Sequence, residues 1–148
     1  EALEVGDLGV VVLEYLPDFR TLDELDRAAV VELAPPLFET LRTIHDAGLA
    51  HGDLRAENVL VRDGELYVID ATSVSEEGRE SARSYDLASA LAALEPLIGA
   101  PNAVDAALAS YSADELLAAR QFLDFVSIRP DHDFEGAELK GELEKRTT

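Results

Sequence analysis

The chain has 148 residues, of which 47% are hydrophobic, so it is long enough to form one domain around its own core. It contains no cysteine, which excludes disulfides, thiolate metal sites and cysteine nucleophiles, and no apolar run approaches the roughly 18 residues of a membrane span. Its 12 basic and 31 acidic residues give a net charge of −19, which disfavours binding to nucleic acid phosphates or to anionic membranes.

The first elements predicted along the chain are a strand and a short helix. Residues 10 to 17, VVVLEYLP, form an apolar run ended by proline, which is typical of a buried strand that leads into a connector. Thr21 and Glu24 then have the spacing of a capping box, so a short helix is expected to begin there.

An amphipathic helix is predicted next, from Pro35 to Ala47. A proline suits the first turn of a helix, and Gly48 suits its C-terminal cap. His45, near the end of this helix, is interpreted as a structural histidine that packs against the following turn. The apolar residues that recur at helical spacing are Leu37, Leu41 and Ile44.

A β-hairpin and several helices are predicted for the rest of the chain. Asp63-Gly64 is a strong tight-turn pair between two apolar runs, residues 59–61 and 66–69. Beyond the hairpin, helices are predicted at residues 87–98, 103–111, 113–126 and 137–145. The expected fold class is therefore α+β, mainly helical with one small β-hairpin.

The decamer HGDLRAENVL, residues 51–60, links the first long helix to the hairpin and allows two interpretations. In one, Gly52 and Asp53 form a turn and Asn58 caps the start of a strand. In the other, the decamer is a catalytic loop. A hairpin returns the chain to its starting point, so Asn58 and Asp70 are expected side by side, where amide and carboxylate oxygens could bind Mg²⁺. Asp53 beside them could accept the proton of an attacking hydroxyl in phosphoryl transfer.

The pattern HxDLxxxN of residues 51–58, followed by the hairpin and Asp70, resembles the catalytic loop and metal-binding aspartate of the protein-kinase-like superfamily. The HGDL form is similar to that of RIO-type atypical kinases, lipopolysaccharide kinases and aminoglycoside phosphotransferases. The resemblance covers residues 10 to 98. It implies the C-terminal lobe of a kinase whose hairpin carries the metal-site residues and whose cofactors are ATP and Mg²⁺.

The resemblance also implies roles for individual residues near the decamer. Asp53 would be the catalytic base, and Asn58 would serve both catalysis and metal binding together with the metal ligand Asp70. Arg55 stands where many kinases carry a lysine that contacts the γ-phosphate, although a surface salt bridge is the alternative for this residue. His51 would brace the loop through hydrogen bonds rather than transfer protons.

Two further parts of the chain fit the same resemblance. The backbone at Glu14 and Leu16 would form the hinge that meets the adenine ring. Asp86, in the sequence YDLA, would be a buried aspartate that accepts hydrogen bonds from backbone amides of the catalytic loop. The expected divisions of the single domain are a last N-lobe strand and hinge (1–16), a kinase-like C-lobe (17–126) and a C-terminal extension (127–148).

The chain also departs from the pattern of typical kinases. It has no glycine-rich loop and no strand lysine, and it begins at Glu1, so we expect most of an N-terminal lobe to lie upstream and this piece alone to be inactive. Ala71-Thr72 replaces Phe-Gly after Asp70, and Gly52 replaces an arginine. Only fifteen residues separate Asp70 from Asp86, so control by a phosphorylated activation loop is not expected.

Three functions are compatible with these residues. The first is an ATP- and Mg²⁺-dependent kinase that transfers the γ-phosphate to a hydroxyl of a protein (serine or threonine) or of a small molecule. The second is a pseudokinase that binds nucleotide or acts as a scaffold, and the third is a RIO-like ATPase. The expected location is the cytoplasm. Only two of the basic residues are lysines, Lys140 and Lys145, and such an acidic, lysine-poor composition resembles that of proteins from salt-loving organisms.

Overall fold

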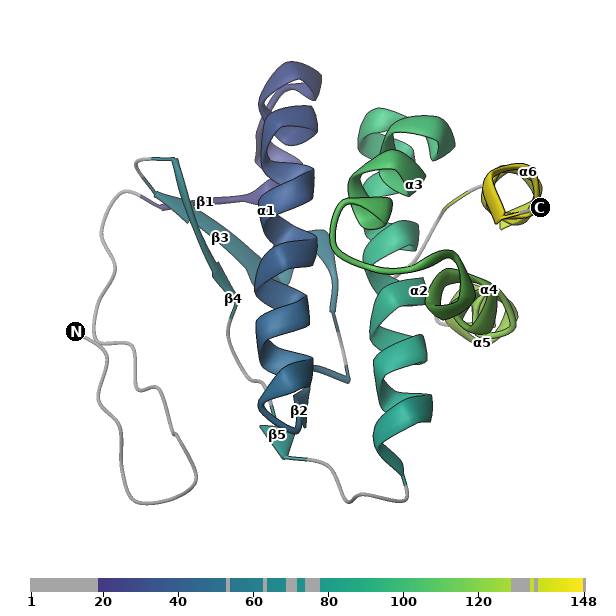
Figure 1. The fold of residues 1–148 in the computed structure, drawn as a ribbon. Coiled ribbons are helices and arrows are strands. Elements are labelled where there is room, and N and C mark those ends of the chain that lie inside the picture. The colour runs from purple at the N-terminus through teal and green to yellow at the C-terminus, as the bar shows by residue number, and fades with distance from the viewer. Residues whose placement is uncertain are drawn as a thin grey trace.

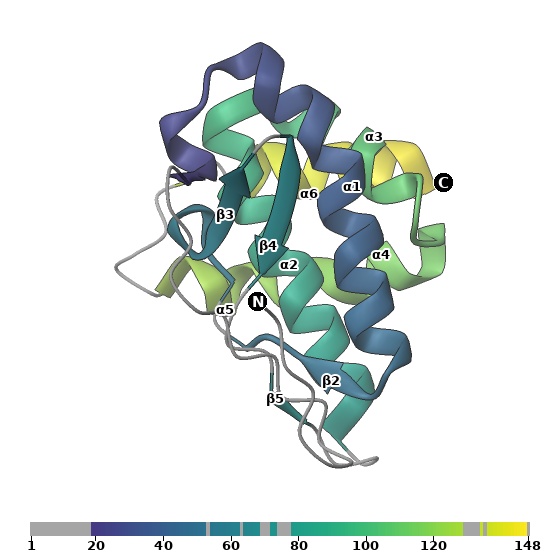
Figure 2. The same cartoon turned by 90° about the vertical axis from the view of Figure 1, so that its left-hand side faces the viewer.

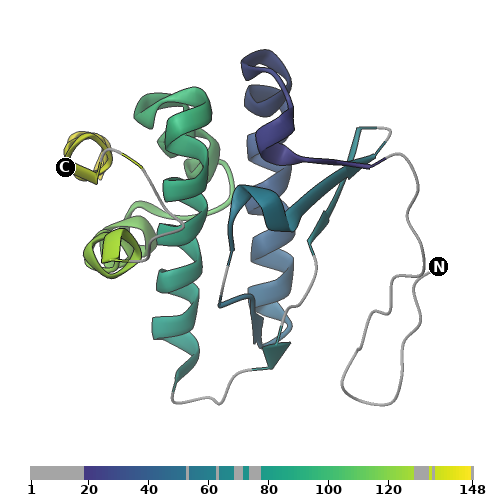
Figure 3. The same ribbon diagram turned by 180° about the vertical axis from the view of Figure 1, so that it is seen from behind.

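Two long helices, α1 (Arg27–Asp46) and α2 (Arg79–Ile98), pack against each other at the centre of the molecule (Figure 1). The structure is a computed structural model, and it describes residues 19–52, 54–62, 64–68, 72–73, 78–128, 134 and 136–147. A small sheet lies on one side of the two helices, and most of the C-terminal helices lie on the other (Figures 1 and 3). The fold is α+β and mainly helical, which confirms the expected class.

The small sheet contains three antiparallel strands in the order β1-β3-β4. The predicted hairpin is confirmed as β3 (Val59–Arg62) and β4 (Glu65–Val68), with Val59 opposite Val68. Its tight turn is possible because Gly64 has a φ of 78°, a conformation that other residues rarely adopt. The third strand, β1 (Arg20–Thr21), pairs with β3 and was not predicted. Figure 2 looks onto this sheet from the side of the hairpin.

A second, two-stranded ribbon lies where α1 ends (Figure 2). Its strands are β2 (Leu49–Ala50) and β5 (Thr72–Ser73), which pair antiparallel with Ala50 opposite Thr72. The ribbon joins the residues just before the decamer to the residues that follow the hairpin. The short helix expected after Thr21 is also present, as the 3-10 helix η2 (Leu22–Glu24), and the Thr21 N–H donates to Glu24 Oε1 at 2.8 Å.

The remaining helices form a layer beside α2. They are α3 (Ala100–Leu108), α4 (Ala113–Arg120), α5 (Leu123–Ile128) and α6 (Gly136–Thr147). The helix predicted as 113–126 is interrupted at residues 121–122, where Phe122 turns its ring toward Tyr85 of α2 at 6.4 Å between centroids. The core lies between α1, α2 and this layer. Its largest fully buried side chains include Phe38, Leu37, Leu41, Leu87, Leu91, Leu94, Ile98, Leu116, Leu123 and Leu139.

The predicted start of the first long helix, Pro35, is wrong. The helix begins eight residues earlier, because the Asp26 carboxylate caps it by accepting the Ala29 N–H at 2.8 Å. Pro35 and Pro36 lie inside the helix and remove two intrahelical hydrogen bonds. The carbonyls that lose these partners belong to the exposed residues 31 and 32, where water can bind them.

Three further helices begin earlier in the chain than the sequence predicted. The helix predicted from Leu87 begins at Arg79. The sequence did not indicate this earlier start, because the first two turns of α2 are mostly polar and show no apolar residues at helical spacing. Helix α3 begins at Ala100 instead of residue 103, and α6 begins at Gly136 instead of residue 137. The predicted strand at residues 10–17, with the proposed hinge at Glu14 and Leu16, lies outside the described residues.

Candidate functional site

The carboxylate of Asp86 holds the backbone at the start of the decamer. Asp86 lies on α2 and is completely buried. Its Oδ2 accepts the N–H of His51 at 2.7 Å and its Oδ1 accepts the N–H of Gly52 at 2.8 Å. A buried carboxylate without such donors would cost several kcal/mol. These are the contacts that the sequence predicted for Asp86, and they fix the chain immediately before Asp53.

His45 reaches the same carboxylate from α1. Its Nε2 lies 2.9 Å from Asp86 Oδ2, and its Nδ1 lies 2.8 Å from the hydroxyl of Tyr111. The side chains of His45 and Tyr111 are buried, and their two rings meet edge-on with centroids 6.0 Å apart. The Gly48 N–H also bonds to the His45 carbonyl at 3.0 Å. His45 is therefore a structural histidine, as the sequence indicated, and it bonds to two other buried residues.

The decamer continues from this anchor to the hairpin through a short helical turn. Leu54 is fully buried and fastens the middle of the loop to the core. The 3-10 helix η3 (Ala56–Asn58) follows, and the Asn58 N–H donates to the carbonyl of Arg55 at 2.9 Å. Asn58 is half-buried and directly precedes Val59, the first residue of β3. The loop is thus fixed at both ends.

The structure places some of the predicted site residues and leaves others outside its description. Asp53 and Asp70, like Glu14 and Leu16, are not among the described residues. The described neighbours of Asp70 are nevertheless paired with the decamer. Val68 pairs with the residue after Asn58, and Thr72 pairs with the residue before His51. The strand before Asp70 therefore pairs with the end of the decamer, and the strand after it pairs with the residue that precedes the decamer.

Arg55 forms an ion pair rather than pointing freely away from the loop. Its guanidinium Nη1 lies 2.7 Å from Glu57 Oε1, and the Arg55 side chain is 25% exposed. This is the salt bridge that was the alternative to a phosphate contact. In this arrangement Glu57 neutralises the charge that would attract a γ-phosphate, so a phosphate role for Arg55 requires the pair to open.

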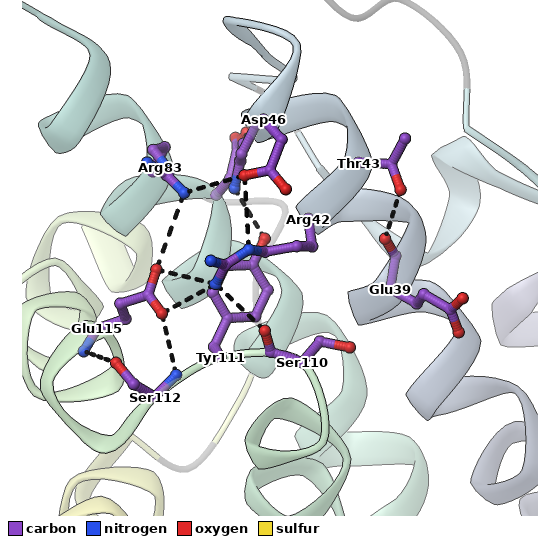
Figure 4. Close-up of polar contacts among 11 residues, drawn as sticks. Glu39, Arg42, Thr43, Asp46, Arg83, Ser110, Tyr111, Ser112 and Glu115 are labelled. Carbon is purple, nitrogen blue, oxygen red and sulfur yellow. Dashed lines mark hydrogen bonds and ion pairs between the residues drawn. The ribbon is translucent and has the colours of Figure 1, made fainter.

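Sequence reasoning missed a polar cluster that connects α1, α2 and α4 around Tyr111 (Figure 4). Arg42 donates to Glu115 Oε1 at 2.9 Å and to the carbonyl of Ser110 at 3.2 Å, and its guanidinium carbon lies 5.2 Å from the centre of the Tyr111 ring. Arg83 lies 3.8 Å from Glu115 Oε2. The contacts of Arg42 span 68 and 73 residues, so no local pattern could have indicated them.

Opposing effects act on the pKa of Glu115. Partial burial raises it, but the N–H of Ser112 and the guanidinium of Arg42 outweigh burial and lower the pKa below its ordinary value of 4.5. A groove of about 420 Å³ between α2 and α4 opens beside this carboxylate. None of the predicted site residues that the structure describes lines this groove. Helix α4 lies on the far side of α2 from the hairpin (Figure 1).

Comparison with known proteins identifies the family. The sequence pattern that defines the RIO domain matches residues 7–86, more than half of the chain. The chain belongs to the RIO family. The match ends at Asp86, the residue that holds the start of the decamer. Tyr111 lies beyond the matched residues. The resemblance to atypical kinases inferred from residues 51–58 is confirmed.

Two relatives of this RIO domain have known names. The KEOPS complex subunit Bud32 of Pyrococcus abyssi is 31% identical over 81 residues, which are 53% of this chain and 37% of that protein. The RIO-type serine/threonine-protein kinase Rio1 of Haloferax volcanii is 56% identical over 32 residues, which are 22% of this chain and 11% of that protein. The matches thus span about a third and a tenth of the relatives' lengths.

No solved structure matches the chain. Within the described part of the chain, no helix has both the length and the apolar character needed to cross a membrane.

Proposed function

We propose that this RIO domain is the C-terminal lobe of an ATP- and Mg²⁺-dependent kinase. The observation that carries the proposal is the anchoring of the decamer by Asp86, because two hydrogen bonds, at 2.7 and 2.8 Å, fix the backbone directly before Asp53. Phosphoryl transfer depends mainly on the placement of groups and on electrostatic stabilisation. A loop held by a buried carboxylate supplies such placement, whereas an ordinary surface turn has no need of it.

In this proposal Asp53 is the catalytic base. It follows the anchored Gly52 directly and precedes Leu54, which is fully buried, so both of its neighbours are fixed. The carboxylate would orient the acceptor hydroxyl and take its proton as the hydroxyl oxygen bonds to the γ-phosphorus, while the bond from that phosphorus to the bridging oxygen of ADP breaks and ADP leaves. His51 would support the loop through its backbone bond to Asp86.

Asn58 and Asp70 are the proposed ligands of Mg²⁺. The pairing of Val59 with Val68 supports this, because it brings the chain just after Asn58 next to the chain just before residue 69. An amide oxygen and a carboxylate, together with phosphate oxygens and water, fit the preference of Mg²⁺ for hard oxygen donors. The ion would neutralise charge on the phosphates, which matters in a chain with a net charge of −19.

The rest of the nucleotide site is also part of the proposal. The backbone at Glu14 and Leu16 would bind adenine, and a glycine-rich loop and a lysine would come from an N-terminal lobe in the sequence before these residues. The phosphoacceptor would be a serine or threonine of a protein, which is favoured by the name of the Haloferax relative, or a small molecule. Because the enzyme would need ATP, we place it in the cytoplasm.

A second candidate function is favoured by the other relative. Bud32 is named as a subunit of the KEOPS complex, so this RIO domain could act as a nucleotide-binding subunit or scaffold of an assembly. The two candidates differ in turnover. A kinase transfers phosphate to a separate acceptor, whereas a scaffold binds nucleotide without needing an acceptor hydroxyl next to Asp53.

The substitution Asp70→Ala tests the proposed metal site in the full-length protein. A hydrogen bond or ligand contact to a charged group contributes about 1.5–3 kcal/mol, so we expect the affinity for ATP with Mg²⁺ to fall by about tenfold or more, and turnover to fall with it. Calorimetric titration with and without Mg²⁺ measures the affinity, and thermal unfolding verifies the fold.

Asp114→Ala is the matched control for this experiment. Asp114 is an exposed carboxylate on α4, so its removal changes the net charge by the same amount on the other side of α2 (Figure 3). The control should bind nucleotide like the unmodified protein. Equal affinities and rates in the Asp70 variant and the control would remove Asp70 from the site.

A further inference from the structure

We infer that Tyr111 is a positioning residue for the decamer loop, acting through His45 and Asp86. Its effect on turnover rests on the proposed function, whereas its effect on the loop does not. Tyr111 lies between α3 and α4, in the part of the chain that the RIO pattern does not cover. The geometry thus assigns to the C-terminal helices a share in holding the loop that precedes Asp53.

Tyr111, His45 and Asp86 form an unbroken series of buried contacts. The Tyr111 hydroxyl lies 2.8 Å from His45 Nδ1, and His45 Nε2 lies 2.9 Å from Asp86 Oδ2. Asp86 in turn accepts the backbone N–H groups of His51 and Gly52. Tyr111, His45 and Asp86 are 3%, 1% and 0% exposed, so water does not compete for these bonds.

With a neutral His45, one arrangement of protons satisfies every group in this series. The Asp86 carboxylate is an acceptor, so His45 must donate to it from Nε2. A neutral imidazole then has an acceptor at Nδ1, and the Tyr111 hydroxyl is the donor that faces it. Burial raises the pKa of the Tyr111 phenol above its ordinary value, so the hydroxyl keeps its proton. Tyr111 therefore supplies the donor that completes the tautomer of His45 required by Asp86, and fixes the ring from its other side.

Tyr111 can hold His45 in this way because it is itself fixed on several sides. Its N–H donates to the carbonyl of Ala107 at 2.9 Å. Its ring packs edge-on against Phe38, with centroids 6.4 Å apart, and the Arg42 guanidinium lies over one face. The hydroxyl thus approaches His45 from a rigid support formed by α1 and the end of α3.

Removal of this single hydroxyl has a defined consequence. In Tyr111→Phe the ring still packs on Phe38, but the buried Nδ1 of His45 loses its donor. The neutral ring of His45 then keeps its hydrogen bond to Asp86 but loses the second bond that fixes the orientation of the ring. The bond from His45 to Asp86 would then be held less firmly, and the bonds from His51 and Gly52 to the same carboxylate would change with it.

The test compares Tyr111→Phe with Ser112→Ala. Ser112 is the next residue and caps α4 by accepting the Glu115 N–H at 3.2 Å, so its removal destabilises the same region without touching His45. The first measurement is the NMR spectrum of the 148-residue chain, read at the ring nitrogens of His45 and at the backbone amides of His51 and Gly52. The second is steady-state turnover of the full-length protein.

In Tyr111→Phe we expect the His45 Nδ1 signal and both amide signals to shift, and kcat to fall by about 2- to 10-fold with little change in the KM for ATP, as for the loss of one hydrogen bond. Ser112→Ala should leave the three signals and kcat unchanged. Unshifted signals in Tyr111→Phe, equal shifts in both variants, or an unchanged kcat in an active protein would overturn the inference. If the unmodified protein has no turnover, the proposed kinase function fails, and the NMR comparison alone decides the role of Tyr111.

Discussion

At the scale of single residues, Gly52 shows why the loop sequence is HGD rather than HRD. Its φ is 84°, in the left-handed region, and this conformation directs its N–H to Asp86 Oδ1. A Cβ added at Gly52 would meet no atom within 4 Å, so space for a Cβ does not require glycine there. The backbone conformation favours glycine there, because the left-handed region is about 1–2 kcal/mol less favourable for a residue with a Cβ.

The substitution Gly52→Ala should therefore destabilise the protein by about 1–2 kcal/mol. Gly141 is a matched control, since a side chain added there also meets no atom within 4 Å, but Gly141 lies in the helix α6 and has no positive φ. Gly141→Ala should stabilise the protein by about 0.5–1 kcal/mol, because alanine favours a helix. Unfolding in urea measures both changes. A stabilising Gly52→Ala would refute the strained conformation.

Residues differ in how far their roles could be read from the sequence. The bonds of Asp86 to the decamer were predicted, because the spacing of residues 51–58 and Asp86 follows a known pattern. The contact between Tyr111 and His45 was not, since it joins residues 66 apart and no neighbouring residue reports on it. The sequence also left two roles open for Arg55, a phosphate contact and a surface salt bridge. The structure shows the salt bridge, with Arg55 Nη1 at 2.7 Å from Glu57 Oε1.

At the scale of elements, local patterns predicted which segments form helices better than where the helices begin. The prolines suggested a start at Pro35, but the cap at Asp26 and the buried residues Val30 and Ala34 extend α1 toward the N-terminus. Strands of two residues, such as β2 and β5, could not be predicted, because two residues show no periodicity. The hairpin was predictable because a tight turn separates two apolar strands.

The contact between α4 and α1 predicts an acid-dependent stability. Because the pKa of Glu115 is lowered in the folded state, its ionised form stabilises the fold above its ordinary pKa of 4.5, and this contribution is lost as the pH falls through the folded value. Glu115 and Arg42 are about a third exposed, so we expect Glu115→Gln to cost less than about 1 kcal/mol at neutral pH. That cost should shrink between pH 7 and about pH 3.

Urea unfolding at the two pH values measures the cost of Glu115→Gln. Glu39→Gln is the control, because it removes one negative charge from an exposed position on α1 and should change the stability little at either pH. A cost for Glu115→Gln that stays constant or grows toward low pH would contradict the role assigned to its carboxylate.

At the scale of the whole molecule, the two halves of the chain contribute differently to the decamer loop. The segment matched by the RIO pattern, residues 7–86, carries the decamer, the hairpin and Asp86. The helices beyond it form a support, since α3 and α4 pack on α1 and α2 and leave Tyr111 against His45. The fold class followed from the sequence, but the order β1-β3-β4 and this support depend on contacts between distant segments.

If the decamer is a catalytic loop with Asp53 as its base, the substitution Asp53→Asn should slow phosphate transfer without weakening nucleotide binding. The amide keeps the shape of the side chain but cannot accept the proton, so single-turnover phosphate transfer by the full-length protein should fall by about 10²- to 10⁴-fold. Nucleotide affinity, measured by titration of the same variant, should change little. Turnover at the unmodified rate, with only a small loss of stability, would mean that residues 51–60 form a structural turn and not a catalytic loop.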